Sequence, residues 1–488
     1  MIIGRIREKV ILKRVLESET AEFVAVFGRR RIGKTFLIEG FFEQQDCAFF
    51  HMVGIQKGAL KTHLNEFFRE LGEVFYHGAK IETSSTWMQA FEALMNAIQH
   101  RSQPQPIVLF FDEFPWLATK KSGLMEALEY YWNRFLKNDK RVKLVICGSS
   151  ASWIIKKIIN NLGGLHNRIT EQINLQPFNL TETKLFLDSL DIRLSKLQIL
   201  ELYFVIGGVP YYLNQLQKNL SVSENINNLC FRKQGRLYDE FKQLFASLFD
   251  EAESYEELVR VIACNRHGIS REEIEKNVQH TQKGGTLTKR LQDLEMAGFI
   301  KKFLPIGHAR RGMFYRILDE YTLFYLQWIE PEKNNMALEI DDGQFWLNIL
   351  KMPQYQSWHG YAFESVCYKH VSYIKKALGL TMATHIGAWR YTPKTHEDGS
   401  GAQIDLLFDR RDDAITLCEI KYSEKPFVLD KACADNIKRL ANTFRTVTRS
   451  KKQIFMVLIT ASGLKANAYS KETIAAVVSL DDFFDDRN

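Results

Sequence analysis

The stretch Gly28-Arg29-Arg30-Arg31-Ile32-Gly33-Lys34-Thr35 has the spacing G-x-x-x-x-G-K-[ST] of a phosphate-binding loop. It follows an apolar run at 22–27 and precedes a helical pattern at 36–42, which is the strand and helix setting that such a loop requires. Glycines let backbone N–H groups curve around phosphate oxygens, and the following helix presents its positive end. We expect Lys34 to reach the terminal phosphates and Thr35 to ligate magnesium. The segment therefore predicts a site for ATP and Mg²⁺.

A second candidate pair, Asp112 and Glu113, ends the apolar run 107–114. An uninterrupted apolar run is typical of a central parallel strand, and two adjacent carboxylates at its end are costly without a cation. We expect Asp112 to hold magnesium directly or through water, and Glu113 to orient and deprotonate the attacking water. Two solvated acids at a strand end are the alternative.

The apolar run 142–150 ends in Ser149 and Ser150, either of which could sense the terminal phosphate of the nucleotide. Capping of the helix that follows is the ordinary role of such serines. Downstream, Arg168 is a candidate arginine finger that acts within its own chain or across a homo-oligomer, and a plain surface arginine is the alternative. This region thus predicts further contacts to the nucleotide.

Three charges interrupt two apolar runs near the end of the chain: Asp405 lies in 404–408, and Glu419 and Lys421 lie in 415–422. Side chains alternate along a strand, so Glu419 and Lys421 share a face. A turn at 410–413 predicts that the two runs form a hairpin, and Glu364 lies upstream in a helical segment. An ion pair on a solvated strand face is the alternative to a functional site.

The elements between 254 and 317 are three short helices followed by two short strands, a pattern that predicts a winged helix-turn-helix. Basic residues gather on the expected recognition helix and wing: Lys289, Arg290, Lys301, Lys302, Arg310, Arg311 and Arg316. Contacts from such residues to nucleic-acid phosphates would be largely independent of sequence and sensitive to salt.

Length, net charge and cysteine spacing limit the class of protein to which these motifs belong. A chain of 488 residues exceeds what one hydrophobic core usually supports, so two to four domains are expected. The net charge of +7 is too weak, spread over the whole surface, to argue for nucleic-acid contact. Seven scattered cysteines without a C-x-x-C pair fit a reducing cytoplasm and argue against structural zinc. No apolar run is long enough for a signal peptide or membrane span, so a soluble cytoplasmic protein is expected.

The motifs GRRRIGKT, FFDEFPWL, CGSS, NRIT, LQPF and IGGVPYYL occur in this order and resemble those of archaeal and bacterial AAA-type ATPases related to the STAND class of signalling NTPases. The resemblance covers residues 1 to about 330. It implies that Gly4, Arg5 and Glu8 lie near the nucleotide. It also implies that the turn containing Gly207, Gly208 and Pro210 belongs to a helical lid that closes over the nucleotide.

The same resemblance bears on two other features. The three arginines Arg29, Arg30 and Arg31 belong to the family pattern, but the loop binds phosphate through its backbone, so their side chains are expected to face the lid or a partner. In STAND-like proteins the winged helix often serves as a hinge packed on the ATPase. DNA contact and a hinge role therefore stand as alternatives for 254–317.

The order Glu364, Asp405, Glu419-x-Lys421 resembles the restriction-endonuclease-like PD-(D/E)XK fold, over roughly residues 350 to 480. The resemblance implies that Asp405 and Glu419 ligate one or two magnesium ions, that Lys421 orients water or stabilises phosphate charge, and that Glu364 completes the site. The proline of the motif is absent, with Gln403 and Ile404 before Asp405. A domain that binds without cutting is the alternative.

The sequence thus predicts an α/β protein in which a P-loop NTPase parallel sheet is followed by a helical lid, a winged helix-turn-helix and a PD-(D/E)XK-like α/β domain. The expected ranges are 1–180, 181–250, 251–330 and 331–488. The leading hypothesis is an ATP-hydrolysing switch that licenses the C-terminal domain on DNA. The alternatives are a nucleotide-regulated scaffold with an inactive C-terminal domain and a DNA-binding regulator controlled by nucleotide state.

Overall fold

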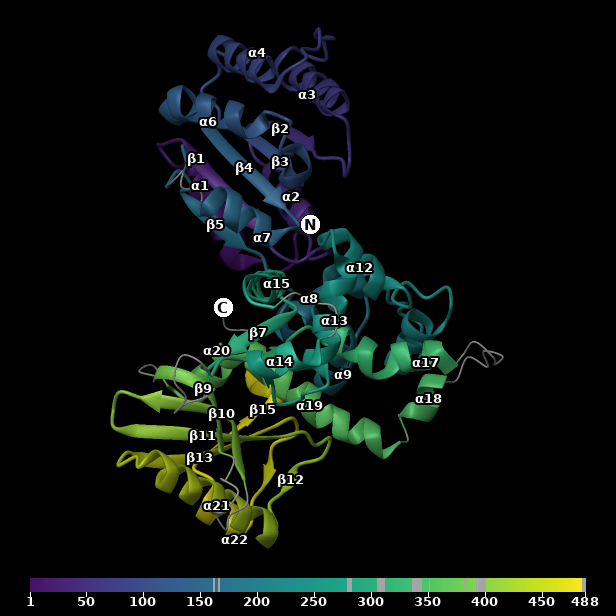
Figure 1. Cartoon of the computed structure of the whole chain (residues 1–488), viewed down its shortest axis with the longest axis vertical. Helices are drawn as coiled ribbons and strands as arrows, with labels where there is room; N and C mark the ends of the chain where they lie inside the picture. Colours follow the sequence, from purple (N-terminus) through teal and green to yellow (C-terminus); the bar gives the residue numbers. More distant parts are fainter. Residues whose placement is uncertain are drawn as a thin grey trace. The chain divides into compact units, whose positions relative to one another are not determined.

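The computed structural model describes residues 1–160, 163–165, 167–278, 283–304, 312–335, 345–350, 352–380, 383–391, 393 and 401–484. The chain forms two compact units, Met1–Pro177 and Phe178–Asn488, which are treated separately below (Figure 1). The predicted boundary at residue 180 lies close to this division. The boundaries predicted near 250 and 330 fall inside the second unit and stay predictions.

The first unit contains a five-stranded parallel sheet in the order β2-β3-β4-β1-β5. Its strands are β1 (Glu22–Phe27), β2 (Ala48–Val53), β3 (Ile107–Asp112), β4 (Val142–Gly148) and β5 (Glu171–Asn174). The central strands β3 and β4 are buried along their whole length, which explains their largely apolar sequences. The predicted strands at 22–27, 107–114 and 142–150 are confirmed, with ends two residues earlier in the last two.

Helices cover both faces of this sheet. They are α1 (Ile6–Glu17), α2 (Lys34–Phe42), α3 (Leu60–Phe75), α4 (Trp87–His100), α5 (Phe114–Leu117), α6 (Leu124–Arg134) and α7 (Ala151–Ile154), with a 3₁₀ turn at Leu136–Asn138 and a π turn at Ile155–Ile159. Residues of α1 and α2 share one buried cluster with Val26 and Val145. On the other face, Phe111 stacks on Phe91 of α4. The result is a three-layer α/β unit, as the sequence predicted.

The second unit begins with a helical region. It comprises α8 (Leu180–Ser189), α9 (Lys196–Ile206), α10 (Pro210–Leu213), α11 (Val222–Ile226), a π turn at Asn227–Phe231 and α12 (Glu240–Leu248). Then come α13 (Ala252–Ala263), β6 (Ile269–Ser270), α14 (Arg271–Asn277), α15 (Gly285–Met296), β7 (Ile300–Phe303) and β8 (Phe314–Ile317). The strands form an antiparallel sheet in the order β6-β8-β7. Three helices and a β7-β8 pair therefore stand where the sequence predicts them.

The C-terminal part of the second unit is built on a five-stranded mixed sheet in the order β15-β13-β11-β10-β9. Its strands are β9 (Ala383–Tyr391), β10 (Ala402–Arg410), β11 (Ala414–Lys421), β13 (Gln453–Thr460) and β15 (Ala476–Ser479), and β12 (Phe427–Val428) pairs separately with β14 (Leu464–Lys465). The accompanying helices are α16 (Glu320–Phe324), α17 (Glu330–Asn335), α18 (Phe345–Ile349), α19 (Pro353–Lys369), α20 (Val371–Ala377), α21 (Lys431–Thr448) and α22 (Ala468–Thr473), with a π turn at Tyr325–Ile329 and a 3₁₀ turn at Leu480–Phe484.

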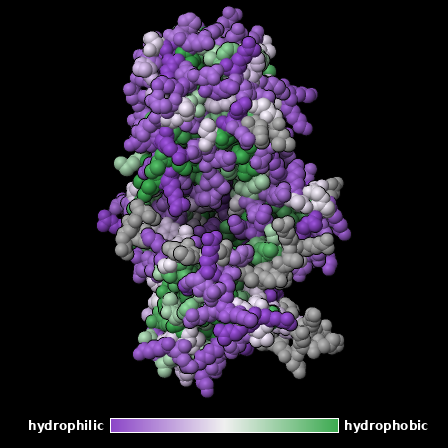
Figure 2. All heavy atoms as spheres, turned by 90° about the vertical axis from the view of Figure 1, so that its left-hand side faces the viewer, coloured by the Kyte–Doolittle hydropathy of each residue, from purple (hydrophilic) through white to green (hydrophobic). Residues whose placement is uncertain are grey.

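The predicted hairpin is confirmed, because β10 and β11 pair antiparallel with Leu406 opposite Cys418. One apolar cluster in the second unit runs from Phe178 to Phe484, so its helical and sheet parts share a continuous core. Figure 2 shows that hydrophilic residues dominate one face of the surface and that hydrophobic atoms occur there in small groups. Within the described residues, no helix is both long and apolar enough to cross a membrane.

Candidate functional site

The phosphate-binding loop joins β1 to α2, as its sequence predicted. Gly28 has φ 145°, and a Cβ at this position would lie 2.2 Å from the carbonyl oxygen of Leu175. Gly33 stands just before α2 in the left-handed region, with φ 83° and ψ 35°. Both glycines are therefore required by the backbone, since other residues rarely adopt these conformations. The loop leads directly into the N-terminus of α2, where N–H groups favour an anion.

Lys34 is the first residue of α2, and its side chain folds back across the loop. The ammonium donates to the carbonyl oxygens of Gly28 at 3.1 Å and Arg29 at 2.9 Å, and the side chain is buried. The charge is thus held inside the curve of the loop. This is the position from which it can meet phosphate oxygens bound by the loop.

The carboxyl ends of β3 and β4 bring the other predicted residues together. The hydroxyl of Thr35 donates to Asp112 at 2.5 Å, and the second carboxylate oxygen of Asp112 accepts from the N–H of Glu113 at 2.8 Å. Glu113 itself has φ 44° and ψ 44°, a left-handed conformation that costs energy for a side chain of this size. Thr35 and Asp112 offer the hard oxygen atoms that magnesium prefers.

Ser149 holds the carboxylate of Glu113. Its N–H donates to Glu113 Oε2 at 3.1 Å and its hydroxyl donates at 2.9 Å. Ser150 occupies the position before α7 but makes no side-chain cap bond. The sequence did not distinguish Ser149 from Ser150. In the structure it is Ser149 that contacts Glu113, the candidate catalytic base.

The sequence also predicts positions for Arg5, Glu8 and the three arginines of the loop. Arg5 is buried and donates to the carbonyl oxygens of Ile32 at 3.1 Å and Gln176 at 2.6 Å, so the start of α1 is tied to the loop. Arg29 is buried, whereas Arg30, Arg31 and Glu8 are half-buried.

Two further predictions placed Arg168 and the turn of Gly207, Gly208 and Pro210 near the nucleotide. The contacts described here do not test them. Arg168 is exposed on the approach to β5, and its finger role stays a prediction. In the second unit, a Cβ on Gly208 would lie 1.8 Å from the carbonyl oxygen of Phe178, which explains the glycine, and Pro210 begins α10. The lid role of this turn also stays a prediction.

Two of the seven basic residues expected on the recognition helix and wing are buried, and the DNA contact of these elements stays a prediction. Arg290 of α15 is 7% exposed and is paired with Glu251, near the ring of Tyr255. Arg316 of β8 is 8% exposed and lies with its guanidinium carbon 3.2 Å from the ring centre of Tyr368. A carboxylate and a ring lie beside Arg290, and two rings, those of Tyr368 and Phe303, lie beside Arg316.

The remaining basic residues of that surface fall into two groups. Lys289, Lys301 and Lys302 are exposed, and Lys302 is paired with Glu295 at 3.0 Å. Arg310 and Arg311 lie outside the described residues.

The hairpin of β10 and β11 brings Asp405, Glu419 and Lys421 together. Lys421 Nζ lies 2.7 Å from Glu419 Oε1, and the backbone N–H of Ile420 donates to Asp405 at 3.4 Å. Asp405 and Glu419 are both buried, 9% and 7% exposed, whereas the side chain of Lys421 is 42% exposed, so one member of the ion pair is buried and the other is partly exposed. Gln403, one step along the same strand face, donates to Asp405 at 3.3 Å.

The electrostatics of this group reflect buried like charges. Burial and the adjacent Glu419 raise the pKa of Asp405 to about 6. Burial and Asp405 raise the pKa of Glu364 to about 8. Although burial acts to lower it, the pKa of Lys421 is raised by Glu419 and Asp405. A bound cation would relieve this repulsion, so the pair Asp405 and Glu419 fits a metal ion chemically.

Glu364 approaches this pair from another element. It lies on α19, which packs against β11, and besides burial the charges of Asp405 and, to a smaller extent, Glu419 raise its pKa. Among the residues described, no three His, Cys, Asp or Glu side chains are grouped so as to hold a metal ion. The metal roles of Asp405, Glu419 and Glu364 stay predictions.

Several polar residues at this end of the sheet were missed from the sequence: His267, Tyr368, Arg390 and Gln403. Tyr368 donates its hydroxyl to the carbonyl oxygen of Asp405, and Gln403 Nε2 lies 2.8 Å from His267 Nδ1. The Q-x-D spacing placed Gln403 on the face of Asp405 and could have identified it. The others come from distant parts of the chain and carry no such signal.

Comparison with known proteins gives a family match in the N-terminal part and similar chains that align over more of the sequence. Residues 4–216 match a family described as an ATPase domain predominantly from Archaea. An uncharacterized protein of Methanocaldococcus jannaschii is 25% identical over 430 residues, which span 87% of this chain and 88% of that protein. The Walker-type ATPase of Pyrococcus abyssi aligns over 67% of this chain and 96% of its own, with 17% identity and a TM-score of 0.47. A STAND protein with a tetratricopeptide repeat sensor from Pyrococcus horikoshii aligns over 78% of this chain and 51% of its own, with 17% identity and a TM-score of 0.30.

The family match covers the loop of Gly28 to Thr35 together with Asp112, Glu113 and Ser149, and the hydrogen bonds described above join these residues into one site. Over residues 4–216 the chain is therefore similar to an ATPase domain found predominantly in Archaea, and it has the loop, carboxylate and serine residues of a P-loop site.

Proposed function

We propose that the protein is a magnesium-dependent ATP-hydrolysing switch whose C-terminal domain acts on nucleic acid. The observation that carries the first half is the connection from Thr35 to Asp112 and from Glu113 to Ser149 at adjacent strand ends. This arrangement supplies a metal ligand, a base and a group that orients the base. Nucleotide hydrolysis requires these three elements beside a phosphate-binding loop.

Each residue has a defined task in this proposal. The loop N–H groups bind the phosphates, and Lys34 transfers its hydrogen bonds from the carbonyl oxygens of Gly28 and Arg29 to phosphate oxygens. Magnesium, held by Thr35 and Asp112, would neutralise charge on the phosphates. Glu113 accepts the proton of the attacking water while Ser149 fixes its carboxylate. Arg168 is the candidate for stabilising charge on the terminal phosphate, within one chain or across a homo-oligomer.

Two assays test the proposed ATP binding and hydrolysis. They measure the binding of a fluorescent ATP analogue and the release of phosphate. Lys34→Ala should abolish nucleotide binding, and Lys61→Ala, which removes an exposed lysine of the same unit, should not. Glu113→Gln should keep binding and lower the hydrolysis rate by a factor of about 10² to 10⁴. Tight ATP binding by Lys34→Ala would contradict the site.

The second half of the proposal is metal-dependent phosphodiester hydrolysis at the hairpin. It is supported by two buried, repelling carboxylates, Asp405 and Glu419, with the ammonium of Lys421 at hydrogen-bond distance from one of them. Carboxylates of this kind bind magnesium, and a lysine beside them can orient water or stabilise phosphate charge.

Cleavage of supercoiled and linear DNA with magnesium or manganese, with and without ATP, tests this second half. Asp405→Ala and Lys421→Ala should abolish cutting, whereas Lys425→Ala, which removes an exposed lysine four residues further along, should not. Cutting that requires ATP would support control by the ATPase. Intact DNA under every condition would favour the alternative, a nucleotide-regulated scaffold or DNA-binding regulator with an inactive C-terminal domain.

A further inference from the structure

We infer that His267, Arg316, Arg390 and Gln403 form a binding site for the phosphodiester backbone of a nucleic acid, beside the acidic hairpin. The site joins the loop after α13, strand β8, strand β9 and strand β10. The inference rests on the proposed function of the hairpin and adds the surface that positions its substrate. It also assigns a role to the segment 251–330 that differs from the predicted recognition helix.

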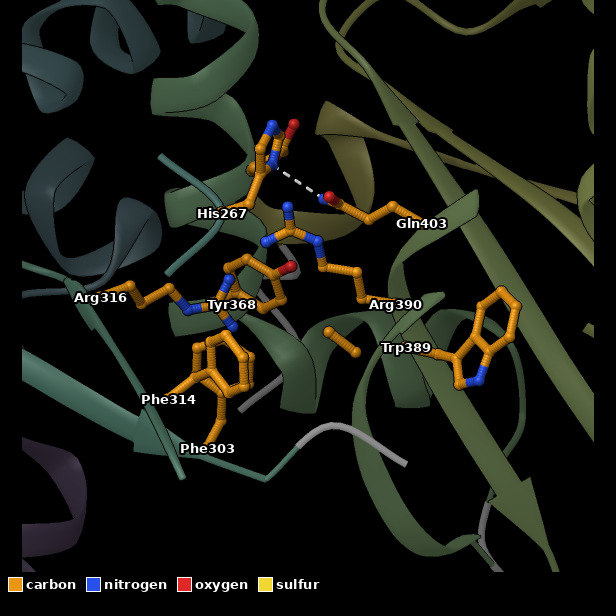
Figure 3. Close-up of a pocket in the computed structure, with 10 residues that line it drawn as sticks. His267, Phe303, Phe314, Arg316, Tyr368, Trp389, Arg390 and Gln403 are labelled. Carbon is orange, nitrogen blue, oxygen red and sulfur yellow. Dashed lines mark hydrogen bonds between the residues drawn. The ribbon is translucent and has the colours of Figure 1, made fainter. Parts of the chain in front are cut away.

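The basic groups converge on one point, although they come from separate elements. Figure 3 shows the side chains of Arg316 and Arg390 reaching toward each other from opposite sides, with His267 and Gln403 above them and the ring of Trp389 turned away. Burial lowers the pKa of His267, and three nearby guanidinium groups lower it further: Arg390, Arg266 and Arg316. Several positive charges therefore act on the same small volume.

Arg316 gives an independent sign of a ligand. It is 8% exposed, its guanidinium lies against the rings of Tyr368 and Phe303, and its Nε has no hydrogen-bond partner among the described residues. A buried donor without a partner is energetically unfavourable. Because this side chain lines the hollow, an anion bound there can receive the missing hydrogen bond.

The size of the hollow decides which part of a nucleic acid fits. Its enclosed volume is about 20 Å³, enough for one water-sized group. A phosphate oxygen fits this space and a stacked base does not. Arg390 also lines the hollow and is exposed, so it can contact the same phosphate from the solvent side.

Gln403 links the basic site to the acidic one. Its side-chain nitrogen lies 2.8 Å from His267 Nδ1 and 3.3 Å from Asp405 Oδ1. Glu364 also lines the hollow. A backbone phosphate held by Arg316 and Arg390 would therefore place the neighbouring phosphodiester close to Asp405.

The predicted recognition helix is a weaker candidate for this contact. Arg290 of α15 is buried and paired with Glu251, so that helix presents one basic residue fewer than the sequence suggested. The segment 251–330 instead contributes Arg316 and His267 to the C-terminal domain. Phosphate contacts of this type position a nucleic acid without reading its sequence.

Fluorescence anisotropy of the full chain with labelled DNA and RNA duplexes of the same sequence tests the site. EDTA keeps cleavage out of the measurement. Arg390 is exposed, so Arg390→Ala should fold normally, and Arg193→Ala removes the same charge from an exposed residue that does not line the hollow. We expect Arg390→Ala to weaken binding about tenfold and to reduce the salt slope by about 1, while Arg193→Ala matches the parent.

The outcomes separate this inference from the function on which it rests. Equal affinities for the two variants, or no binding of either duplex by the parent, would overturn the phosphate site. If nucleic-acid binding depends on Arg390 but the protein cleaves no nucleic acid, the phosphate site is supported and the proposed nuclease activity is contradicted. The duplex that binds more tightly identifies the substrate as DNA or RNA.

Discussion

The guanidinium carbon of Arg316 lies 3.2 Å from the ring centre of Tyr368, which joins strand β8 to helix α19 across more than fifty residues of sequence. Tyr368 in turn donates its hydroxyl to the backbone of Asp405. The small β6-β8-β7 sheet is therefore connected through two side chains to the strand that carries the acidic site. This connection, rather than an exposed wing, defines the surroundings of Arg316.

Removal of this cation–aromatic contact should destabilise the second unit cooperatively. In a double-mutant cycle with Arg316→Ala and Tyr368→Ala, we expect a coupling free energy of about 1–2 kcal/mol, because the pair is desolvated. Urea unfolding monitored by tryptophan fluorescence measures it. Additive effects of the two substitutions would contradict a direct interaction, and Arg193→Ala provides the control for loss of a surface arginine.

Ser149 should affect catalysis more than nucleotide binding. Ser149→Ala removes the hydroxyl hydrogen bond to Glu113 but keeps the backbone one, so we expect kcat for ATP hydrolysis to fall about tenfold with little change in Kd for ATP. Ser150→Ala is the matched control, since the Ser150 side chain makes no cap bond. Equal effects of the two substitutions would argue against a special role for Ser149.

Gly28 should tolerate no side chain. A Cβ there would lie 2.2 Å from the carbonyl oxygen of Leu175, so Gly28→Ala must displace the loop or strand β5. We expect a loss of unfolding free energy above about 2 kcal/mol together with loss of ATP binding. Gly123→Ala is the comparison, because nothing lies within 4 Å of its Cβ and only its φ of 74° opposes alanine, at a cost of about 1 kcal/mol. Similar losses for both variants would show that steric contact is not the cause.

His370 should make the second unit sensitive to acid. It is fully buried and neutral, since Nε2 accepts from the N–H of Leu180 at 3.2 Å and Nδ1 lies 2.8 Å from the carbonyl oxygen of Val366. Burial lowers its pKa from the ordinary 6.5 to about 4. Between pH 6.5 and pH 4 the imidazole is therefore protonated in the unfolded chain and neutral in the folded chain. The stability present above pH 6.5 is lost as the pH falls toward 4.

The test compares the parent with His370→Gln, which cannot titrate. The stability difference between the two should shrink by about 2 kcal/mol between pH 7.5 and pH 5, at 1.36 kcal/mol per pKa unit. Urea unfolding at a series of pH values measures it, and other histidines affect both proteins alike. A difference that stays constant with pH would mean that His370 is not the titrating group.

The sequence by itself determined the parts of the protein that are contiguous in the chain. The loop at 28–35, the strand ending in Asp112 and the hairpin carrying Asp405 and Glu419 each follow from local rules, because glycine conformation, apolar runs and alternation act over a few residues. These rules placed the phosphate-binding loop, the strand that ends in Asp112 and the β10-β11 hairpin where the structure has them.

Only the tertiary structure decided which charges reach one another. It placed Ser149 rather than Ser150 on Glu113, buried Arg290 and Arg316, and paired Arg390 of β9 with Gln403 of β10 in register. A sequence pattern records where a charged side chain occurs but not which rings and carboxylates from distant elements surround it. Burial and pairing of such residues arise when separate elements pack into one core, so they cannot be read from spacing along the chain.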